Sequence, residues 1–273
     1  MKVKFSYWKD GKKKALTMSY DDANVADRRL VEIFNQYGVK GTFHLNSGLF
    51  SDWTVSPEEI PALYAGHEIS AHTLRHRFMD CIPREEIFDE VLEDRRRLEK
   101  LSGYLVCGAS YPQGAYNSEV VEAVRMLGYR YCRTCVSTGK FNLPDDFLLW
   151  HPTCHHKEAL EYVEKFKKTT RPLALFYVWG HSFEFDKKNN WDLIEQFCDE
   201  LGGDPDTWYA TNIEIYDYVS ALRALRFSAD RTLVYNPSAA DVWIEADHVC
   251  VKVPGGATLN LEEEVNKHES EEK

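Results

Sequence analysis

Short apolar segments alternate with amphipathic helical segments through residues 14–225, and this alternation limits the fold more than any other feature of the sequence. Strands that alternate with helices form a parallel sheet that the helices cover. The number of units favours an α/β fold with an irregular (β/α) barrel of about 7–8 parallel strands. No glycine-rich fingerprint follows the first strand, which argues against the doubly wound nucleotide-binding folds. The predicted strands are residues 14–20, 39–45, 66–71, 104–110, 129–134, 147–150, 171–178 and 208–211.

The pattern changes after residue 227 and divides the chain into three parts. Residues 1–227 are expected to form the barrel. Residues 228–260 contain short strand-like segments separated by Asn, Pro, Ser and Gly, which predicts a small β-rich appendage packed on the barrel. Residues 261–273 are charged and polar, as in a disordered terminal tail.

The charge and the apolar pattern exclude some classes of partner. A net charge of -11 opposes binding to nucleic acid, because phosphates repel an acidic surface. No stretch approaches the ~20 apolar residues of a membrane span, and no signal-peptide pattern stands at the N-terminus. Seven scattered cysteines are a poor disulfide framework and indicate a reducing compartment. We therefore expect a cytoplasmic protein without nucleic-acid or membrane partners, and a homo-oligomer stays open.

Two polar motifs follow predicted strands in the first half of the barrel. Asp21 and Asp22 follow the first strand, and His72 and His76 follow the third. Each motif also has a simpler interpretation, since an acidic pair is a common helix N-cap and two histidines four apart can lie on a surface turn. Together the motifs supply two imidazoles and one carboxylate for a divalent metal, with a second carboxylate left as general base. Because the carboxyl ends of barrel strands share one rim, the motifs predict a hydrolytic metal site there.

Other histidines and cysteines also follow predicted strands. His181 ends an apolar strand, where it is either a core histidine bonded to the backbone or a proton donor to a leaving group. A second group of possible ligands consists of Cys132, Cys135, Cys154, His155 and His156. This group could form a structural zinc site. Its spacing lacks the two-knuckle pattern of such sites, which favours buried free thiols instead. His151, His155 and His156 line a loop, and the sequence assigns them no role.

Several aromatic residues lie in or beside the predicted rim loops. Stacking on a sugar ring would suit them, but packing is the more frequent use of any single aromatic side chain. The sequence alone does not separate the two uses. These residues are Trp53, Tyr111, Trp150, Trp179 and Phe183.

The ordered motifs resemble those of the polysaccharide deacetylases of the NodB-homology type, carbohydrate esterase family four. The resemblance covers roughly residues 14–225 and implies the irregular barrel of that family. The strong matches are residues 17–22 to its Thr-Phe-Asp-Asp segment, 41–44 to its Ala-Thr-Phe-Phe strand and 72–76 to its His-[Ser/Thr]-x-x-His motif. The weaker matches are residues 110–114 to Arg-Pro-Pro-Tyr-Gly and 178–181 to Leu-x-His.

The resemblance implies a role for each matched polar residue. Asp22, His72 and His76 would bind the metal, Asp21 would act as the base and His181 as the acid. The cation would be Zn2+ in the first place, with Co2+ or Ni2+ as alternatives.

The resemblance also implies a loop that faces the substrate. A backbone N–H near Gln113 would help to hold the developing oxyanion. Tyr111 and Trp179 would lie beside the substrate.

Two positions depart from the family pattern. Ser110 stands where the family has an Arg that orients the base, and Leu149 stands where it has an Asp whose carboxylate tunes the acid. The loss of both groups indicates a divergent branch whose ligands and base are oriented by other residues. Glu184, Asp186 or His155 could replace them.

The expected function is metal-dependent hydrolysis of a carbon–nitrogen bond other than a peptide bond. We expect the enzyme to remove acetyl groups from an N-acetylated or O-acetylated carbohydrate by means of metal-activated water. Two alternatives stay open: a hydrolase of a small linear or cyclic amide or imide with the same site, and a non-catalytic carbohydrate-binding protein with a degenerate site. The enzymatic substrate would be a small molecule or an oligosaccharide.

Overall fold

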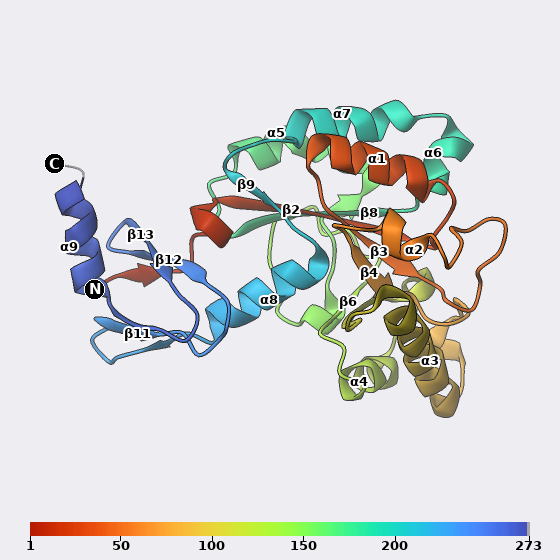
Figure 1. Cartoon of the computed structure of the whole chain (residues 1–273), viewed down its shortest axis with the longest axis horizontal. Coiled ribbons are helices and arrows are strands. Elements are labelled where there is room, and N and C mark those ends of the chain that lie inside the picture. The colour runs from red at the N-terminus through yellow and green to blue at the C-terminus, as the bar shows by residue number, and fades with distance from the viewer. Residues whose placement is uncertain (272–273) are drawn as a thin grey trace.

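A computed structural model describes residues 1–271 and contains one large parallel sheet (Figure 1). The strand order is β6-β5-β4-β3-β2-β8-β7, and β9 pairs with β2 beside β3. Every pairing in this sheet is parallel. The strands are β2 (Lys14–Asp21), β3 (Gly41–Leu45), β4 (Glu68–Ala71), β5 (Gly108–Ser110), β6 (Tyr131–Arg133), β7 (Cys154–His155), β8 (Ala174–Gly180) and β9 (Thr207–Tyr209).

One segment links the two ends of this sheet and curls it into a barrel. Trp150 forms a parallel bridge with Arg133 on β6. A few residues later, Cys154 and His155 form β7 and pair with β8. The segment therefore runs from the first strand of the sheet to the last, which confirms the expected irregular (β/α) barrel of parallel strands.

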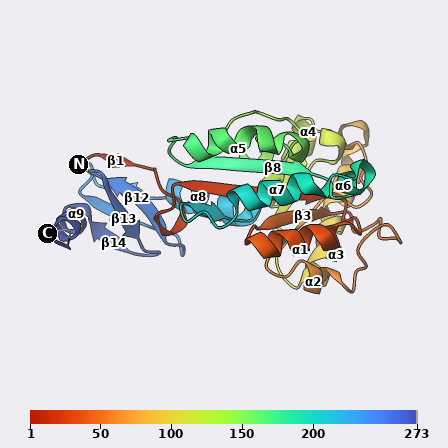
Figure 2. The ribbon, with the colours of Figure 1, turned by 90° about the horizontal axis from the view of Figure 1, so that it is seen from above.

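The helices cover the outside of the barrel in two groups. Helices α1, α5 and α7 pack side by side, and α3 and α4 pack together on the other side of the molecule (Figures 1 and 2). The helices are α1 (Asp27–Tyr37), α2 (Ile60–Leu63), α3 (Arg84–Ser102), α4 (Ser118–Met126), α5 (Ala159–Lys168), α6 (Phe183–Lys188), α7 (Trp191–Leu201), α8 (Asn212–Arg223) and α9 (Leu261–Glu271).

Two predicted strands differ from the structure. The predicted strand 147–150 is a 3-10 helix over Phe147–Leu149, because the Asp146 side chain accepts from Leu148 N at 2.9 Å and caps a helical turn. The predicted strand 104–110 is ordered as β5 only over Gly108–Ser110. Both are short apolar runs, for which periodicity does not separate strand from helix or loop.

A small β-rich appendage lies at the end of the barrel where β2 begins, away from the carboxyl ends of the strands (Figures 1 and 2). It has two antiparallel three-stranded sheets, β1-β12-β13 and β10-β11-β14. The strands are β1 (Val3–Lys4), β10 (Arg226–Phe227), β11 (Leu233–Tyr235), β12 (Val242–Ala246), β13 (Val249–Val253) and β14 (Thr258–Asn260). The N-terminal residues therefore join this part, so the predicted boundary at residue 227 does not separate the two.

The C-terminal segment differs from the disordered tail predicted for residues 261–273. Residues 261–271 form helix α9, and residues 272–273 lie outside the described residues. Leu261 and Val265 lie one helical turn apart and are buried in the core that joins the appendage to the barrel. Three glutamates in the first turn favour the helix N-terminus. The charged composition concealed this two-residue apolar stripe.

The cysteines and the helices bear on two further expectations. All seven cysteines are free, and the groups of possible metal ligands found within residues 1–271 contain no cysteine. The alternative of a structural zinc site at Cys132, Cys135 and Cys154 is therefore not supported. Within the same residues, every helix is too short or too polar to cross a bilayer.

Candidate metal centre

The carboxyl ends of β2 and β4 bring the three expected metal ligands together. Asp22 Oδ1 lies 3.8 Å from His72 Nε2 and 3.7 Å from His76 Nε2. The two imidazole rings have centroids 4.8 Å apart. Metal–ligand bonds of about 2.0–2.2 Å place the atoms of a tetrahedral site roughly 3.3–3.6 Å apart. The distances from Asp22 to the two histidines thus lie within a few tenths of an ångström of those in a zinc site, and all three ligand atoms lie within 4.8 Å of one another.

Hydrogen bonds orient His72 for this role. His72 Nδ1 lies 3.1 Å from the carbonyl oxygen of Ser110, which can only accept, and 2.7 Å from Ser110 Oγ, whose own proton goes to Asp21, so we assign the proton of His72 to Nδ1. The lone pair of Nε2 then faces Asp22, as a metal ligand requires. The buried carboxylate of Asp94 accepts from the backbone N–H of His72 at 3.1 Å and from that of Ser47 at 2.8 Å. Burial, the main cause, lowers the pKa of His72 and keeps the imidazole neutral.

The backbone around these ligands is unusual. Asp22, Thr73, His76 and Gln113 have φ values of 78°, 64°, 53° and 57°. The left-handed region disfavours residues with a side chain, and such conformations gather at functional sites. The turns after β2, β4 and β5 therefore have strained backbone conformations at the expected metal ligands and at Gln113, the residue expected to bind the oxyanion.

Asp21 is buried beside the ligand set and has a cationic partner that the sequence did not reveal. Its side chain is 2% exposed and accepts a hydrogen bond from Arg133 on β6 and another from Ser110 Oγ at 3.3 Å. Burial raises the pKa of Asp21, but the Arg133 guanidinium and the nearby imidazoles of His72, His44 and His181 together outweigh burial and hold the pKa well below its usual range. Arg133 on β6 thus makes the contact with the base that was expected of the arginine absent at position 110. The signal for it was a charged residue in a predicted buried strand, which normally requires a buried partner.

His181 lies on the other side of Asp21, at the end of β8. Its Nε2 is 4.0 Å from Asp21 Oδ2 and 3.9 Å from Asp22 Oδ2, and its Nδ1 is 2.9 Å from Glu184 Oε1. Because a carboxylate only accepts, Nδ1 carries the proton and Nε2 faces the two aspartates. Burial lowers the pKa of His181, but the bond to Glu184 and the aspartate charges raise it above its ordinary value. Glu184 therefore occupies the place expected for a carboxylate that tunes the acid, whereas Asp186 accepts from Trp191 Nε1 at 2.8 Å.

The three residues expected at the substrate differ in their placement. Gln113 is close to the ligand set, with Nε2 3.5 Å from His76 Nδ1. Tyr111 is 2% exposed and its hydroxyl donates to Leu148 O at 2.9 Å, so its side chain belongs to the core. Trp179 is partly buried, and its ring lies under the guanidinium of Arg133, whose Cζ is 4.5 Å from the ring centroid.

The remaining aromatic residues divide into core and surface. Trp150 is fully buried. Trp53 is 77% exposed, and its carbonyl accepts from Val25 N at 3.0 Å, which ties its loop to the residues directly after Asp22. Trp53 is therefore an exposed aromatic side chain on a loop that is bound to the segment after Asp22. Phe183 lies against His181, with ring centroids 5.1 Å apart.

The three histidines without an assigned role separate into two environments. His151 Nδ1 lies 2.6 Å from Thr134 Oγ1, beside Arg133. His155 Nε2 and His156 Nε2 lie 3.2 Å and 3.7 Å from the carboxylate of Glu184. His155, His156 and Glu184 form the second of two groups in residues 1–271 with the proximity of metal ligands.

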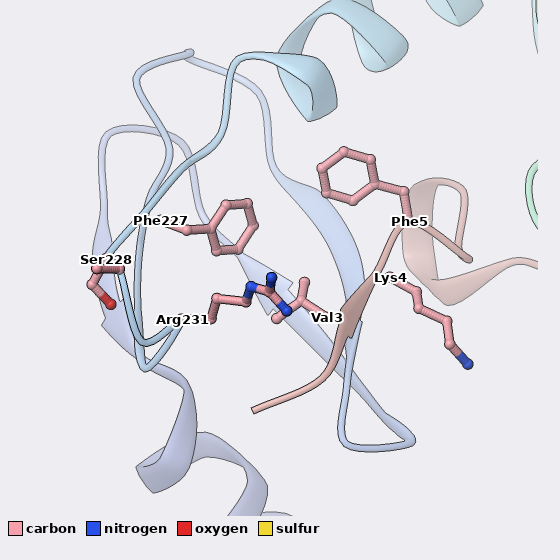
Figure 3. A pocket seen from close by; sticks show the side chains of 7 residues that line it. Val3, Lys4, Phe5, Phe227, Ser228 and Arg231 are labelled. Atoms are coloured by element: carbon pink, nitrogen blue, oxygen red, sulfur yellow. The ribbon is translucent and has the colours of Figure 1, made fainter.

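A pocket of about 290 Å³ lies far from this rim, in the appendage (Figure 3). Phe227 and Arg231 line one side of it and Val3 and Phe5 the other, while the side chain of Lys4 points away from them. It contains no histidine or carboxylate, so it lacks the groups that hydrolysis needs.

A comparison with known protein families gives a match to the first half of the chain. Residues 9–132 match the family model described as polysaccharide deacetylase. This range includes Asp21, Asp22, His72 and His76 but ends before Arg133 and His181. No curated protein sequence matches the chain.

Solved structures share the fold at low sequence identity. A protein from Mycobacterium smegmatis assigned to the polysaccharide deacetylases is 17% identical, with a TM-score of 0.62, and the match covers 81% of this chain and 96% of that one. A T48 deacetylase solved with substrate is 14% identical, with a TM-score of 0.52 and coverage of 74% and 90%. A Streptococcus pyogenes deacetylase in complex with acetate is 19% identical, with a TM-score of 0.43 and 44% coverage of this chain. The match spans only 55% of the length of that protein.

Proposed function

We propose that this chain, whose residues 9–132 match the polysaccharide deacetylase family model, is a metal-dependent hydrolase that removes acetyl groups from an N-acetylated or O-acetylated carbohydrate. One observation carries the proposal. A set of zinc-type ligands, Asp22, His72 and His76, stands beside a separate carboxylate, Asp21, and a separate imidazole, His181. Hydrolysis of an unreactive acyl bond needs these three components within reach of one carbonyl group.

Each side chain has a chemical task that follows from its surroundings. A divalent cation at the ligand set supplies a Lewis acid that polarises a carbonyl group and eases the ionisation of water. Asp21 stays ionised beside Arg133 and accepts the proton of the attacking water. His181 presents Nε2 to the same space, and in its doubly protonated form, which Glu184 and the aspartates favour, it donates the Nε2 proton to the leaving nitrogen or oxygen. The acyl bond breaks, and the products are acetate and a free amine or alcohol.

The loop after β5 supports the oxyanion. Gln113 has a left-handed backbone and lies beside His76, so we assign its N–H to the oxygen that gains charge as the carbonyl is attacked. Trp53 is the exposed aromatic side chain tied to the residues after Asp22, and we assign it to stacking against a sugar ring. Tyr111 receives no substrate contact in this proposal.

Several features bear on the proposed metal, substrate and compartment. Zn2+ suits two imidazoles and a carboxylate, and Co2+ or Ni2+ can take the same donors. We propose a small molecule or oligosaccharide substrate rather than a cell-wall polymer, and a cytoplasmic location, because seven free thiols suit a reducing compartment. A degenerate, non-catalytic site was an alternative because an arginine and an aspartate were missing. Arg133 and Glu184 stand beside the base and the acid, so we do not propose that alternative.

The test is a hydrolysis screen with zinc, cobalt or nickel added. It measures acetate release from N-acetyl and O-acetyl sugars and the loss of starting compound for linear amides and cyclic imides. We expect release from at least one acetylated sugar. His76→Ala should lose both bound zinc and turnover, whereas His248→Ala, which changes an exposed histidine in the appendage, should lose neither. Retention of zinc by His76→Ala would contradict the assigned ligand set. Turnover of imides alone would overturn the assignment to carbohydrates.

A further inference from the structure

The proposed base and the proposed acid are joined by a closed circuit of contacts through four other elements of the barrel. Asp21 accepts from Arg133, and the guanidinium of Arg133 lies over the ring of Trp179. Trp179 meets His155 edge to face, with ring centroids 4.8 Å apart and an interplanar angle of 87°. The members of the circuit are Asp21 on β2, Arg133 on β6, Trp179 on β8, His155 on β7, Glu184 on α6, and His181 between β8 and α6.

The second half of the circuit returns to Asp21. His155 Nε2 donates to Glu184 Oε1 at 3.2 Å, and Glu184 Oε1 accepts from His181 Nδ1 at 2.9 Å. His181 Nε2 lies 4.0 Å from Asp21 Oδ2, where the circuit began. Strand register supports this arrangement, because His155 on β7 is paired with Trp179 on β8. We propose that Trp179 and His155 are positioning residues that hold the base and the acid in one fixed geometry; this rests on the proposed function.

The ring of Trp179 packs against the buried guanidinium of Arg133. Arg133 is completely buried. Its Nη2 donates to Asp21 and its Nη1 to Thr134 O at 3.3 Å, but its Nε has no hydrogen-bond partner. The face of a tryptophan attracts a cation, and this attraction is stronger where water is excluded. Trp179 therefore fixes the plane of the guanidinium and, through it, the direction of the Asp21 carboxylate.

His155 plays the matching part for the acid. Its Nδ1 accepts from Lys157 N at 3.4 Å, so the proton is on Nε2, which donates to Glu184. His156 Nε2 lies 3.7 Å from the same carboxylate, and its ring packs against the rings of Tyr20 and Phe185. Glu184 is thus fixed from two sides before it accepts from His181. This proton arrangement makes His155 a hydrogen-bond donor, although its group also has the proximity of metal ligands.

Kinetics would test the circuit with four variants and two controls. Trp179→Leu and His155→Gln should each lower kcat on the most active compound of the acetate screen about 10-fold, with KM within roughly two-fold, as for partners that orient metal-site groups. Trp179→Phe keeps a ring face and should retain activity within about three-fold. The double variant Trp179→Leu/His155→Gln should lose much less than the product of the single losses, because both break one circuit. The controls are Trp243→Leu, which removes a similar ring–cation pair in the appendage, and His248→Gln.

A spectroscopic readout makes the test independent of turnover. Long-range 1H–15N spectra of the zinc-loaded protein should report His181 with its proton on Nδ1, and His155→Gln should convert that signal to a mixture of tautomers. The signal is assigned with His181→Gln. An unchanged His181 signal, or additive losses in the double variant, would overturn the circuit. A second zinc per chain that His155→Gln removes would also overturn it, in favour of a metal site at His155, His156 and Glu184. Failure of the acetate screen would leave the spectra interpretable, so the two proposals fail separately.

Discussion

Two buried carboxylates at opposite ends of the barrel differ in their ionisation. Asp21 at the rim is 2% exposed and Glu68 at the start of β4 is 6% exposed. Asp21 has Arg133 beside it, and its pKa is well below the usual range. Glu68 has only neutral donors, Tyr131 Oη at 2.7 Å, Thr42 Oγ1 at 3.0 Å and Ile213 N at 2.9 Å. Burial raises the pKa of Glu68 to about 7, and these hydrogen bonds only partly oppose the rise.

One strand produces this difference. Tyr131 and Arg133 are two residues apart on β6, so their side chains point to the same face of the sheet. Tyr131 contacts Glu68 and Arg133 contacts Asp21. Hydrogen bonds from neutral groups do not compensate burial of a negative charge, whereas an adjacent cation does. Arg133 on β6 is thus the main cause, with nearby imidazoles, that keeps Asp21 an anion, and Glu68 has no such cation beside it.

The largest expected effect comes from removal of the rim charge. Asp21→Asn keeps a hydrogen-bond acceptor for Arg133 but cannot take a proton from water. We expect kcat to fall about 10²–10⁴-fold with zinc still bound, since general base catalysis contributes that much. Turnover and zinc content of the purified protein are the measurements. The matched change at the other end, Glu68→Gln, should leave kcat at pH 7 within about two-fold. A fully active Asp21→Asn enzyme would remove Asp21 from the reaction.

Removal of the cation tests the comparison directly. Arg133→Met should lower the free energy of unfolding by about 3–5 kcal/mol, because it leaves the buried Asp21 without a partner. The double variant Arg133→Met/Asp21→Asn should recover part of this loss, since it buries no unpaired charge. Urea unfolding at pH 7 measures both. If the double variant is no more stable than Arg133→Met, the loss arises from packing and the role assigned to the ion pair is wrong.

The smallest effect is expected at Glu68 and concerns pH. The folded pKa of Glu68, about 7, exceeds its ordinary value of 4.5, so the folded state binds the proton more tightly. The stability from this group is full below pH 4.5 and decreases as pH rises through 7. Glu68→Gln removes that decrease. Between pH 5 and pH 8, the free energy of unfolding of the wild type should therefore fall by on the order of 1–3 kcal/mol relative to that of Glu68→Gln. If this difference stays constant between pH 5 and pH 8, the pKa of Glu68 in the folded state is not raised.

Local sequence predicted the barrel and the ligand set because these depend on patterns within single segments. The Asp-Asp pair and the two histidines each follow a buried strand, and parallel strands bring their carboxyl ends to one rim. The partners of the base and the acid depend on register between strands instead. Arg133 lies 112 residues from Asp21, and no local pattern pairs them. Glu184 was one of three candidates, and only the turn into α6 selected it over Asp186. Helix α9 was missed because two apolar residues carry its packing within a charged segment.

The pairing of β1 with β12 has a consequence for biosynthesis. Lys4 bonds to Glu245, a partner 241 residues further along the chain. Chains emerge from the ribosome N-terminus first, and domains generally fold as units during synthesis. The barrel strands can assemble before β12, the partner of β1, has been translated. Closure of β1 onto β12 is therefore among the final steps of folding, and a nascent chain that stops before residue 242 leaves its own N-terminus without a strand to join.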